Sequence, residues 1–160
     1  MPNFAAIDGY ALGGRGELVM ACDMRIEGKS GRFGQTEIKV GIIPGAGATV
    51  RLVRLVGLGK AKELVMTGKI VTAEEAYRIN LINAVVDDEK LMDEAIALAQ
   101  SKTRHSPVAL GLAKSSVQRS RFAHCRHPGE CLLLPVLCQP RPEGGDAGLL
   151  GKRKPAYHGR

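Results

Sequence analysis

Two glutamates, Glu17 and Glu37, are the residues of this chain best suited to proton chemistry. Each stands inside a glycine-bearing segment, ALGGRGEL (residues 11–18) and RFGQTEI (residues 32–38). Two carboxylates that converge can work together, because one can polarise a water molecule while the other carries a proton. A single glutamate near a helix start is more often a capping or dipole partner, so the inference depends on both.

The glycines that precede Glu17 indicate a site for negative charge. A short apolar segment (residues 4–7) leads to a turn at Asp8-Gly9, and an apolar, helix-like run covers residues 17–22. This order places Gly13 and Gly14 where a strand gives way to a helix N-terminus. Backbone N–H groups at such a position lack an intrahelical acceptor, so they can bind an anion or a developing oxyanion.

A third segment, GIIPGAGAT (residues 41–49), repeats this pattern. Pro44 lies near an expected helix start, and apolar residues follow at positions 50, 53, 55 and 56. The glycines of this segment allow the backbone to approach another group closely.

In their order and spacing, these segments resemble the crotonase (enoyl-CoA hydratase/isomerase) superfamily. Its pattern AAxxGxALGGGxEL, FGxPE and GxxPGxGGTxRL corresponds here to AAIDGYALGGRGEL, FGQTE and GIIPGAGATVRL, and the resemblance runs from Phe4 to about Gln118. It implies an α/β protein with a partial ββα-spiral fold, in which short strands are followed by C-terminal helices. The chain departs from the pattern at Arg15, Thr36 and Ala48, where the family has glycine, proline and glycine.

The resemblance also implies a reaction, the hydration of a 2-enoyl-CoA. It assigns Gly14 as a backbone oxyanion donor and Glu17 and Glu37 as the acid/base pair around a water. Retention of both glutamates favours hydration over the isomerase reactions of the family. No cofactor is implied, since the coenzyme A thioester is the substrate, and the expected assembly is a homotrimer or hexamer. The residues expected to bind substrate are Gly13, Pro44 and Gly45.

An alternative function is that of a truncated, non-catalytic fragment that acts in subunit assembly or binding. Crotonase domains begin with an N-terminal half that supplies the other oxyanion donor in an AGAD-like loop. This chain contains no such loop, so we expect the N-terminal half to be missing. Loss of one oxyanion donor typically lowers a rate by about 10² to 10³.

The sequence divides into three parts. Residues 1–118 resemble the C-terminal part of a crotonase-like domain, residues 119–150 form an aberrant or divergent tail, and residues 151–160 again resemble a family C-terminus. The segment QPRPEGGDAGL (residues 139–149) equals a shifted-frame translation of a family-like ASPDQKEGMQAFL peptide. We therefore interpret the tail as the product of an inserted base and a later compensating deletion; a genuine divergent extension is the alternative.

Charge and cysteine content place most of the unusual composition in that tail. Of the net charge of +7, residues 1–118 carry 15 Lys and Arg against 13 Asp and Glu, and residues 119–160 carry 8 against 3. With 4% aromatic residues and no Trp, the chain offers little base stacking, which disfavours a nucleic-acid partner. The spacing of His124, Cys125, His127, Cys131 and Cys138 fits no standard closed zinc site, so no metal is expected.

No signal peptide, membrane span or clear transit peptide is visible in the sequence, which predicts a cytoplasmic protein without a membrane partner. The helical pattern predicts two helices over residues 45–56 and 59–66, separated by Gly57. A capping box at residues 72–75 predicts a short helix to Ile79. The later elements expected are a strand or extended link over residues 83–86, a helix from Asp88 to about Lys102, and another helix beginning at Ser106-Pro107.

Overall fold

The computed structural model describes residues 1–119, which fall into two compact units. One unit comprises Asn3–Ala97, and the other includes Met1–Pro2 and residues 98–119. Every residue expected at the active site lies in the first unit. The tail interpretation and the possible zinc ligands lie outside the described residues.

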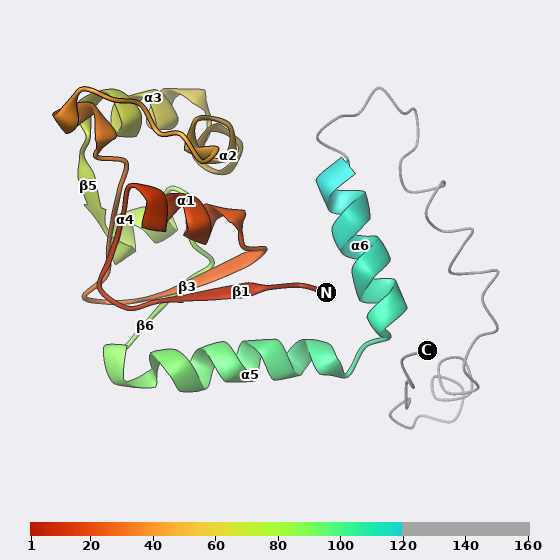
Figure 1. The fold of residues 1–160 in the computed structure, drawn as a ribbon. Helices are drawn as coiled ribbons and strands as arrows, with labels where there is room; N and C mark the ends of the chain where they lie inside the picture. The colour runs from red at the N-terminus through yellow and green to blue at the C-terminus, as the bar shows by residue number, and fades with distance from the viewer. Residues whose placement is uncertain (120–160) are drawn as a thin grey trace, which may run out of the picture. The chain divides into compact units, whose positions relative to one another are not determined.

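The first unit opens with two strands and a helix, and the turn predicted at Asp8-Gly9 separates the strands. These are β1 (Phe4–Ile7), β2 (Tyr10–Leu12) and α1 (Gly14–Ala21) (Figure 1). Gly9 makes the turn between the strands with a φ of 71°, a left-handed conformation that glycine adopts without steric cost. The helix begins three residues before the expected run, so Glu17 lies in its first turn rather than at its start.

The next two strands each pair with one of the first two. Strands β3 (Met24–Gly28) and β4 (Arg32–Gly34) run parallel to β1 and β2, with Phe4 opposite Met24 and Tyr10 opposite Arg32. The two three-stranded sheets have the orders β1-β3-β6 and β2-β4-β5. Because the carboxyl ends of β2 and β4 meet at one edge, the residues that follow these strands lie together.

The sheets are completed by β5 (Ile70–Thr72), antiparallel to β4, and by β6 (Ala84–Val86), parallel to β3. The strand or extended link expected over residues 83–86 is thus a strand, which begins at Ala84. The helical segments of the described chain that follow α1 are η1 (Glu37–Val40), α2 (Ala48–Val56), α3 (Leu58–Thr67), α4 (Ala73–Arg78), η2 (Asp88–Lys90), α5 (Leu91–Thr103) and α6 (Pro107–Arg119).

The helix expected over residues 45–56 begins later than predicted. Gly47 is its N-cap and has a φ of 99°, so regular helix starts only at Ala48. The predicted break at Gly57 is confirmed, because Gly57 has a φ of 79° and separates α2 from α3. A glycine can occupy a helix or a left-handed cap with similar ease, and the sequence pattern alone does not distinguish the two.

The predicted capping box is half formed. The Thr72 Oγ1 atom accepts the Glu75 N–H at 3.2 Å, which satisfies one free donor at the start of α4. The Glu75 side chain binds Lys69 Nζ at 3.2 Å instead of returning to the Thr72 backbone. Further along, Asp88 opens the short η2 segment, and α5 follows it from Leu91.

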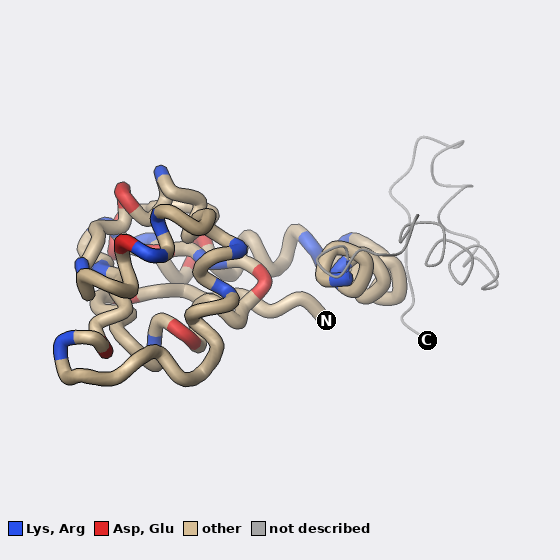
Figure 2. Tube along the Cα trace, turned by 90° about the horizontal axis from the view of Figure 1, so that it is seen from above, with Lys and Arg blue, Asp and Glu red and all other residues tan. Residues whose placement is uncertain are grey.

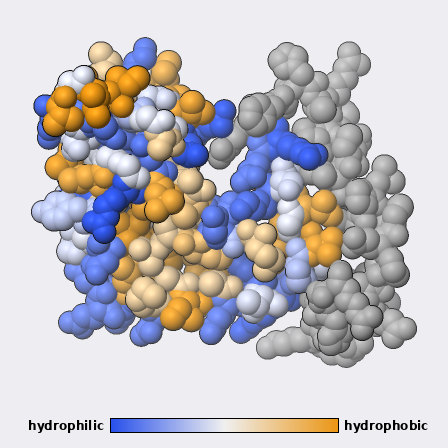
Figure 3. Space-filling view, in the orientation of Figure 1, coloured by the Kyte–Doolittle hydropathy of each residue, from blue (hydrophilic) through white to orange (hydrophobic). Residues whose placement is uncertain are grey.

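The surface of the first unit carries mixed charge and one apolar strip. Figure 2 shows basic and acidic positions interspersed over this unit, without a face of one sign. Figure 3 shows a hydrophobic patch where Figure 1 draws η1 and α3. The exposed apolar residues of η1 and the loop after it, here called the η1 strip, are Ile38, Val40, Ile42 and Ile43. Among residues 1–119, no helix combines the length and the apolar character that a membrane crossing requires.

One carboxyl group lies in the core of this unit. Glu27 on β3 is 0% exposed, and neither of its side-chain oxygens has a hydrogen-bond partner within the described chain. Its side chain fills the space that a Cβ on Gly31 would need. Desolvation by burial raises the pKa of Glu27 to about 7; the nearby charge of Arg32 opposes this shift, and that of Glu74 adds to it.

Candidate active site

Glu17 is held in the first turn of α1 by two backbone groups. Its own N–H donates to the Gly13 carbonyl at 3.0 Å, and its Oε1 atom accepts the N–H of Ala48 at 3.0 Å. The residue is only 4% exposed. Within residues 1–119, no hydrogen bond occupies Oε2. One carboxylate oxygen is therefore fixed by the backbone, and the other is available for chemistry.

Gly13 and Gly14 present a backbone donor at the start of α1. The Gly13 carbonyl accepts from Glu17 N and from the Gln35 Nε2 atom, the latter at 3.3 Å. In a trans peptide the carbonyl and the following N–H point in opposite directions, so the Gly14 N–H points away from these partners. It has no acceptor among the described residues and can bind an oxyanion.

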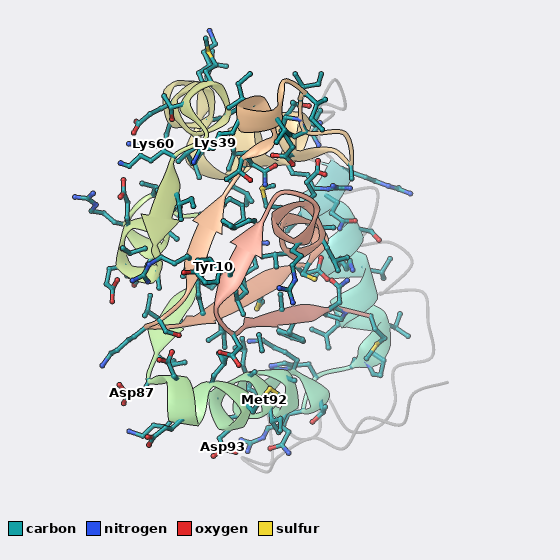
Figure 4. All side chains as sticks on the ribbon, turned by 60° about the vertical axis from the view of Figure 1, so that its left-hand side comes forward. Tyr10, Lys39, Lys60, Asp87, Met92 and Asp93 are labelled. Carbon is teal, nitrogen blue, oxygen red and sulfur yellow. The ribbon has the colours of Figure 1, made fainter. Side chains whose placement is uncertain are left out.

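Glu37 reaches the same glycines from the neighbouring strand. It follows β4 as the first residue of η1, and its Oε1 atom lies 3.3 Å from the position that a Cβ on Gly13 would occupy. Its Oε2 atom is buried and has no hydrogen-bond partner in the described part of the chain. The elements that carry Gly13 and Glu37 can be followed in Figure 4 from the labelled Tyr10 on β2 and Lys39 in η1.

The third glycine segment joins the site through its backbone. Pro44 is buried and Gly45 is exposed, and both lie in the loop that leads to Ala48. This loop is linked to Glu17 by the Ala48 N–H rather than by a side chain. A backbone donor carries no residue-type signal, so the sequence offers no sign of this contact.

Two of the departures from the family pattern do not obstruct the site. The Arg15 side chain reaches back toward β2, where its Nη1 atom lies 3.5 Å from the Tyr10 carbonyl, and no residue beyond the chain neighbours and helix backbone of Gly14 lies within 4 Å of a Cβ built on it. The positive φ near Ala48 belongs to Gly47, so alanine is unstrained at position 48. Two further polar side chains touch the site backbone: Gln35, which is 0% exposed, and Arg51 in α2, which is the arginine of the GIIPGAGATVRL segment.

Gly13 is a position of the site at which a side chain would destabilise the fold. Its φ of 54° and ψ of −128° suit glycine, and a Cβ would also press on the Glu37 carboxylate. We expect Gly13→Ala to lower the free energy of unfolding by about 1–3 kcal/mol, measured by urea denaturation. Gly14→Ala is the matched control, since Gly14 has no positive φ and no residue beyond its chain neighbours and helix backbone lies within 4 Å of its Cβ position. Equal losses in the two variants would contradict this interpretation.

The described residues contain no group of three or more His, Cys, Asp or Glu side chains that could hold a metal ion. The site brings together two carboxylates and a free backbone N–H. These are the parts needed to move a proton and to stabilise a developing negative charge on oxygen.

Parallel strand-strand-helix turns, with a carboxylate pair beside a glycine-lined helix N-terminus, define the chain as an α/β protein of the ββα-spiral class. A family model described as enoyl-CoA hydratase/isomerase matches residues 1–124. The chain belongs to this enoyl-CoA hydratase/isomerase family, so the resemblance and the fold class predicted from the sequence are confirmed.

The chain is similar to several hydratases. It is 47% identical to a short-chain-enoyl-CoA hydratase of Clostridium acetobutylicum over 118 residues, which cover 74% of this chain and 45% of that protein. It is 38% identical to a 2,3-dehydroadipyl-CoA hydratase of Escherichia coli over 163 residues, which cover 99% of this chain and 64% of that protein.

The same similarity appears among solved structures. The crystal structure of an enoyl-CoA hydratase from Bacillus anthracis matches with a TM-score of 0.95 and 37% identity, covering 100% of this chain and 63% of that one. The chain thus spans about half to two thirds of the length of these relatives.

Proposed function

We propose that this site hydrates 2-enoyl-CoA thioesters, with Glu17 and Glu37 as the acid/base pair and Gly14 as an oxyanion donor. The observation that carries the proposal is the convergence of three groups on one helix N-terminus. Glu17 binds the Gly13 carbonyl through its N–H, Glu37 lies against Gly13, and the adjacent Gly14 N–H is free. Relatives named as enoyl-CoA hydratases support the same reaction class.

The reaction adds the elements of water across the α,β double bond of the thioester. One carboxylate accepts a proton from water while the water oxygen bonds to the β-carbon, and the π electrons move toward the carbonyl. The thioester oxygen gains negative charge, which the Gly14 N–H stabilises. A proton then reaches the α-carbon from the other carboxyl group, giving a 3-hydroxyacyl-CoA.

The burial of one Glu37 oxygen supports a role for this residue in binding a water molecule. Glu37 Oε2 is buried without a hydrogen-bond partner in the described chain, and a buried polar atom of this kind is usually satisfied by water or a ligand. Glu17 is fixed through one oxygen only. Each carboxylate thus retains one oxygen for the substrate or the water. We also propose that Gly13, Pro44 and Gly45 line the acyl-CoA.

We further propose that residues 1–118 act as the C-terminal part of a crotonase-like domain, in a homotrimer or hexamer. The η1 strip supports an assembly, because its four large apolar side chains are 41–75% exposed and lie close in sequence. Exposed apolar residues that gather in this way are typical of protein–protein contacts.

The second candidate function is a non-catalytic fragment that binds or assembles. It is favoured by one observation: the chain spans 45% of the length of the Clostridium acetobutylicum hydratase. If the acyl-CoA pocket needs the remainder of that length, this chain retains the glutamates without a complete pocket.

Binding and assembly measurements distinguish the two functions. We expect isothermal titration with crotonyl-CoA to show saturable binding, and sedimentation analysis to show an oligomer. A folded sample that forms oligomers but does not bind crotonyl-CoA would support the non-catalytic function and contradict the hydratase.

A further inference from the structure

The side chain of Arg51 folds back onto the loop that precedes its own helix. Its Nη1 atom donates to the Ala46 carbonyl at 2.6 Å. A Cβ on Gly47 would lie only 2.7 Å from Nη1 and 3.1 Å from Cζ, so the guanidinium lies against the Gly47 backbone. A hydrogen bond from a charged donor is stronger than a neutral one. Arg51 therefore holds residues 46 and 47 in one conformation.

The same loop supplies the donor that holds Glu17. The Gly47 carbonyl accepts the Arg51 backbone N–H at 2.9 Å. Because the peptide that joins Gly47 to Ala48 is trans, the Ala48 N–H points the opposite way. It donates to Glu17 Oε1 at 3.0 Å in a buried position. The carbonyl of this peptide group is thus hydrogen-bonded within α2, and its N–H is hydrogen-bonded to the Glu17 carboxylate.

The location of Arg51 is unusual for a cation. It is the fourth residue of α2, and that helix has no acidic residue in its first turn. The helix dipole disfavours positive charge near a helix N-terminus by about 0.3–1 kcal/mol at an exposed site. Since the position is electrostatically unfavourable, the specific contacts with Ala46 and Gly47 are the interactions that account for an arginine here.

We propose that Arg51 is a positioning residue for Glu17. Its guanidinium fixes the Ala46–Gly47 loop, the loop aims the Ala48 N–H, and this N–H holds Oε1 of the carboxylate. Oε2 is then directed consistently toward the substrate. The inference rests on the proposed function for the role of Glu17, but the link from Arg51 to Ala48 is a property of the fold and can be tested without activity.

Amide hydrogen exchange, followed by NMR, tests this link directly. In Arg51→Met we expect the Ala48 amide to exchange ~10-fold faster or more, with the Val56 amide at the other end of α2 little changed. Arg78→Met on α4 is the matched control and should leave Ala48 unchanged. Unchanged exchange at Ala48, or an equal increase at Ala48 and Val56, would overturn the proposal.

A double substitution tests whether the effect passes through Glu17. Glu17→Ala removes the acceptor of the Ala48 N–H and should itself speed the exchange of that amide. Adding Arg51→Met to Glu17→Ala should then have less than the effect that it has alone, because the two residues act on one hydrogen bond. If Arg51→Met speeds the exchange of the Ala48 amide by the same factor with and without Glu17→Ala, the proposal is contradicted.

Kinetics supply a readout that a purely structural role would not move. We expect Arg51→Met to lower kcat for crotonyl-CoA by ~10- to 100-fold through misplacement of the carboxylate, with KM changed by less than about threefold. Arg51→Lys should recover part of kcat, because its ammonium can still donate to Ala46. A rise in KM with an unchanged kcat would overturn the proposal. Absence of hydration by the wild type would contradict the proposed function, while the exchange comparison would still decide the role of Arg51.

Discussion

Glu37→Gln is expected to lower kcat for crotonyl-CoA hydration by about 10³-fold, within the range typical of a lost general acid or base. Glutamine keeps the shape of the side chain that lies against Gly13, but it cannot accept and return a proton at neutral pH. The binding surface remains, so KM should change little. Steady-state kinetics on purified protein measure both constants.

Glu17→Gln should have an effect of similar size for the same reason. Its amide oxygen can still accept the Ala48 N–H, so the local backbone is preserved. Because the proposed mechanism has both glutamates act on one water and one substrate, the double variant should lose little more than either single variant. Glu89→Gln, at an exposed position in η2, is the matched control and should retain wild-type kcat. Near-normal turnover in either single variant would remove that glutamate from the proposed pair.

The second large effect is a change in the free energy of unfolding with pH, and we expect it to arise from Glu27. Burial raises the pKa of this carboxyl from 4.5 to about 7 in the folded chain. Between these values the folded chain keeps a proton that the unfolded chain has released, so a rise in pH favours unfolding. The slope is about 1.4 kcal/mol per pH unit, which amounts to a loss of about 3 kcal/mol across the interval.

The sign of this effect is the reverse of that for a salt-bridged carboxylate. The contribution is fully present below pH 4.5, where both states are protonated, and is lost as the pH rises through about 7. Glu27→Gln cannot ionise, so the difference in free energy of unfolding between it and the wild type should change by about 3 kcal/mol between pH 4.5 and 8. Urea denaturation followed by circular dichroism gives this difference. A difference that stays constant with pH would show that Glu27 titrates normally.

Local signals in the sequence predicted much of the fold. The glycine at position 57, the Thr72 cap and the apolar segments each specify their structure within a few residues, and the corresponding elements are confirmed. The start of α2 was misplaced because Gly45 and Gly47 look alike in a sequence, whereas only Gly47 takes the left-handed conformation. Backbone angles at a glycine depend on packing around it, so residue type alone does not fix them.

The sequence pattern does not predict contacts between residues that lie far apart in the chain. Glu27 looks like an ordinary surface charge, yet it is 0% exposed on β3, the central strand of the β1-β3-β6 sheet. The nearest sequence signal is the glycine four residues later, since Gly31 leaves the space that Glu27 fills. The motifs drew attention to the glutamates, but the backbone donor that holds the Glu17 carboxylate belongs to Ala48, a residue with no reactive side chain.

The most direct test of the proposed site is the product that this chain forms from crotonyl-CoA in deuterium oxide. Hydration by an acid/base pair should yield 3-hydroxybutyryl-CoA with one non-exchanging deuteron on the α-carbon, visible by mass spectrometry and NMR, and Glu37→Gln should form almost none. Recovery of unreacted crotonyl-CoA from a folded wild-type sample that binds it would contradict the assignment of Glu17, Glu37 and Gly14 as a working hydration site.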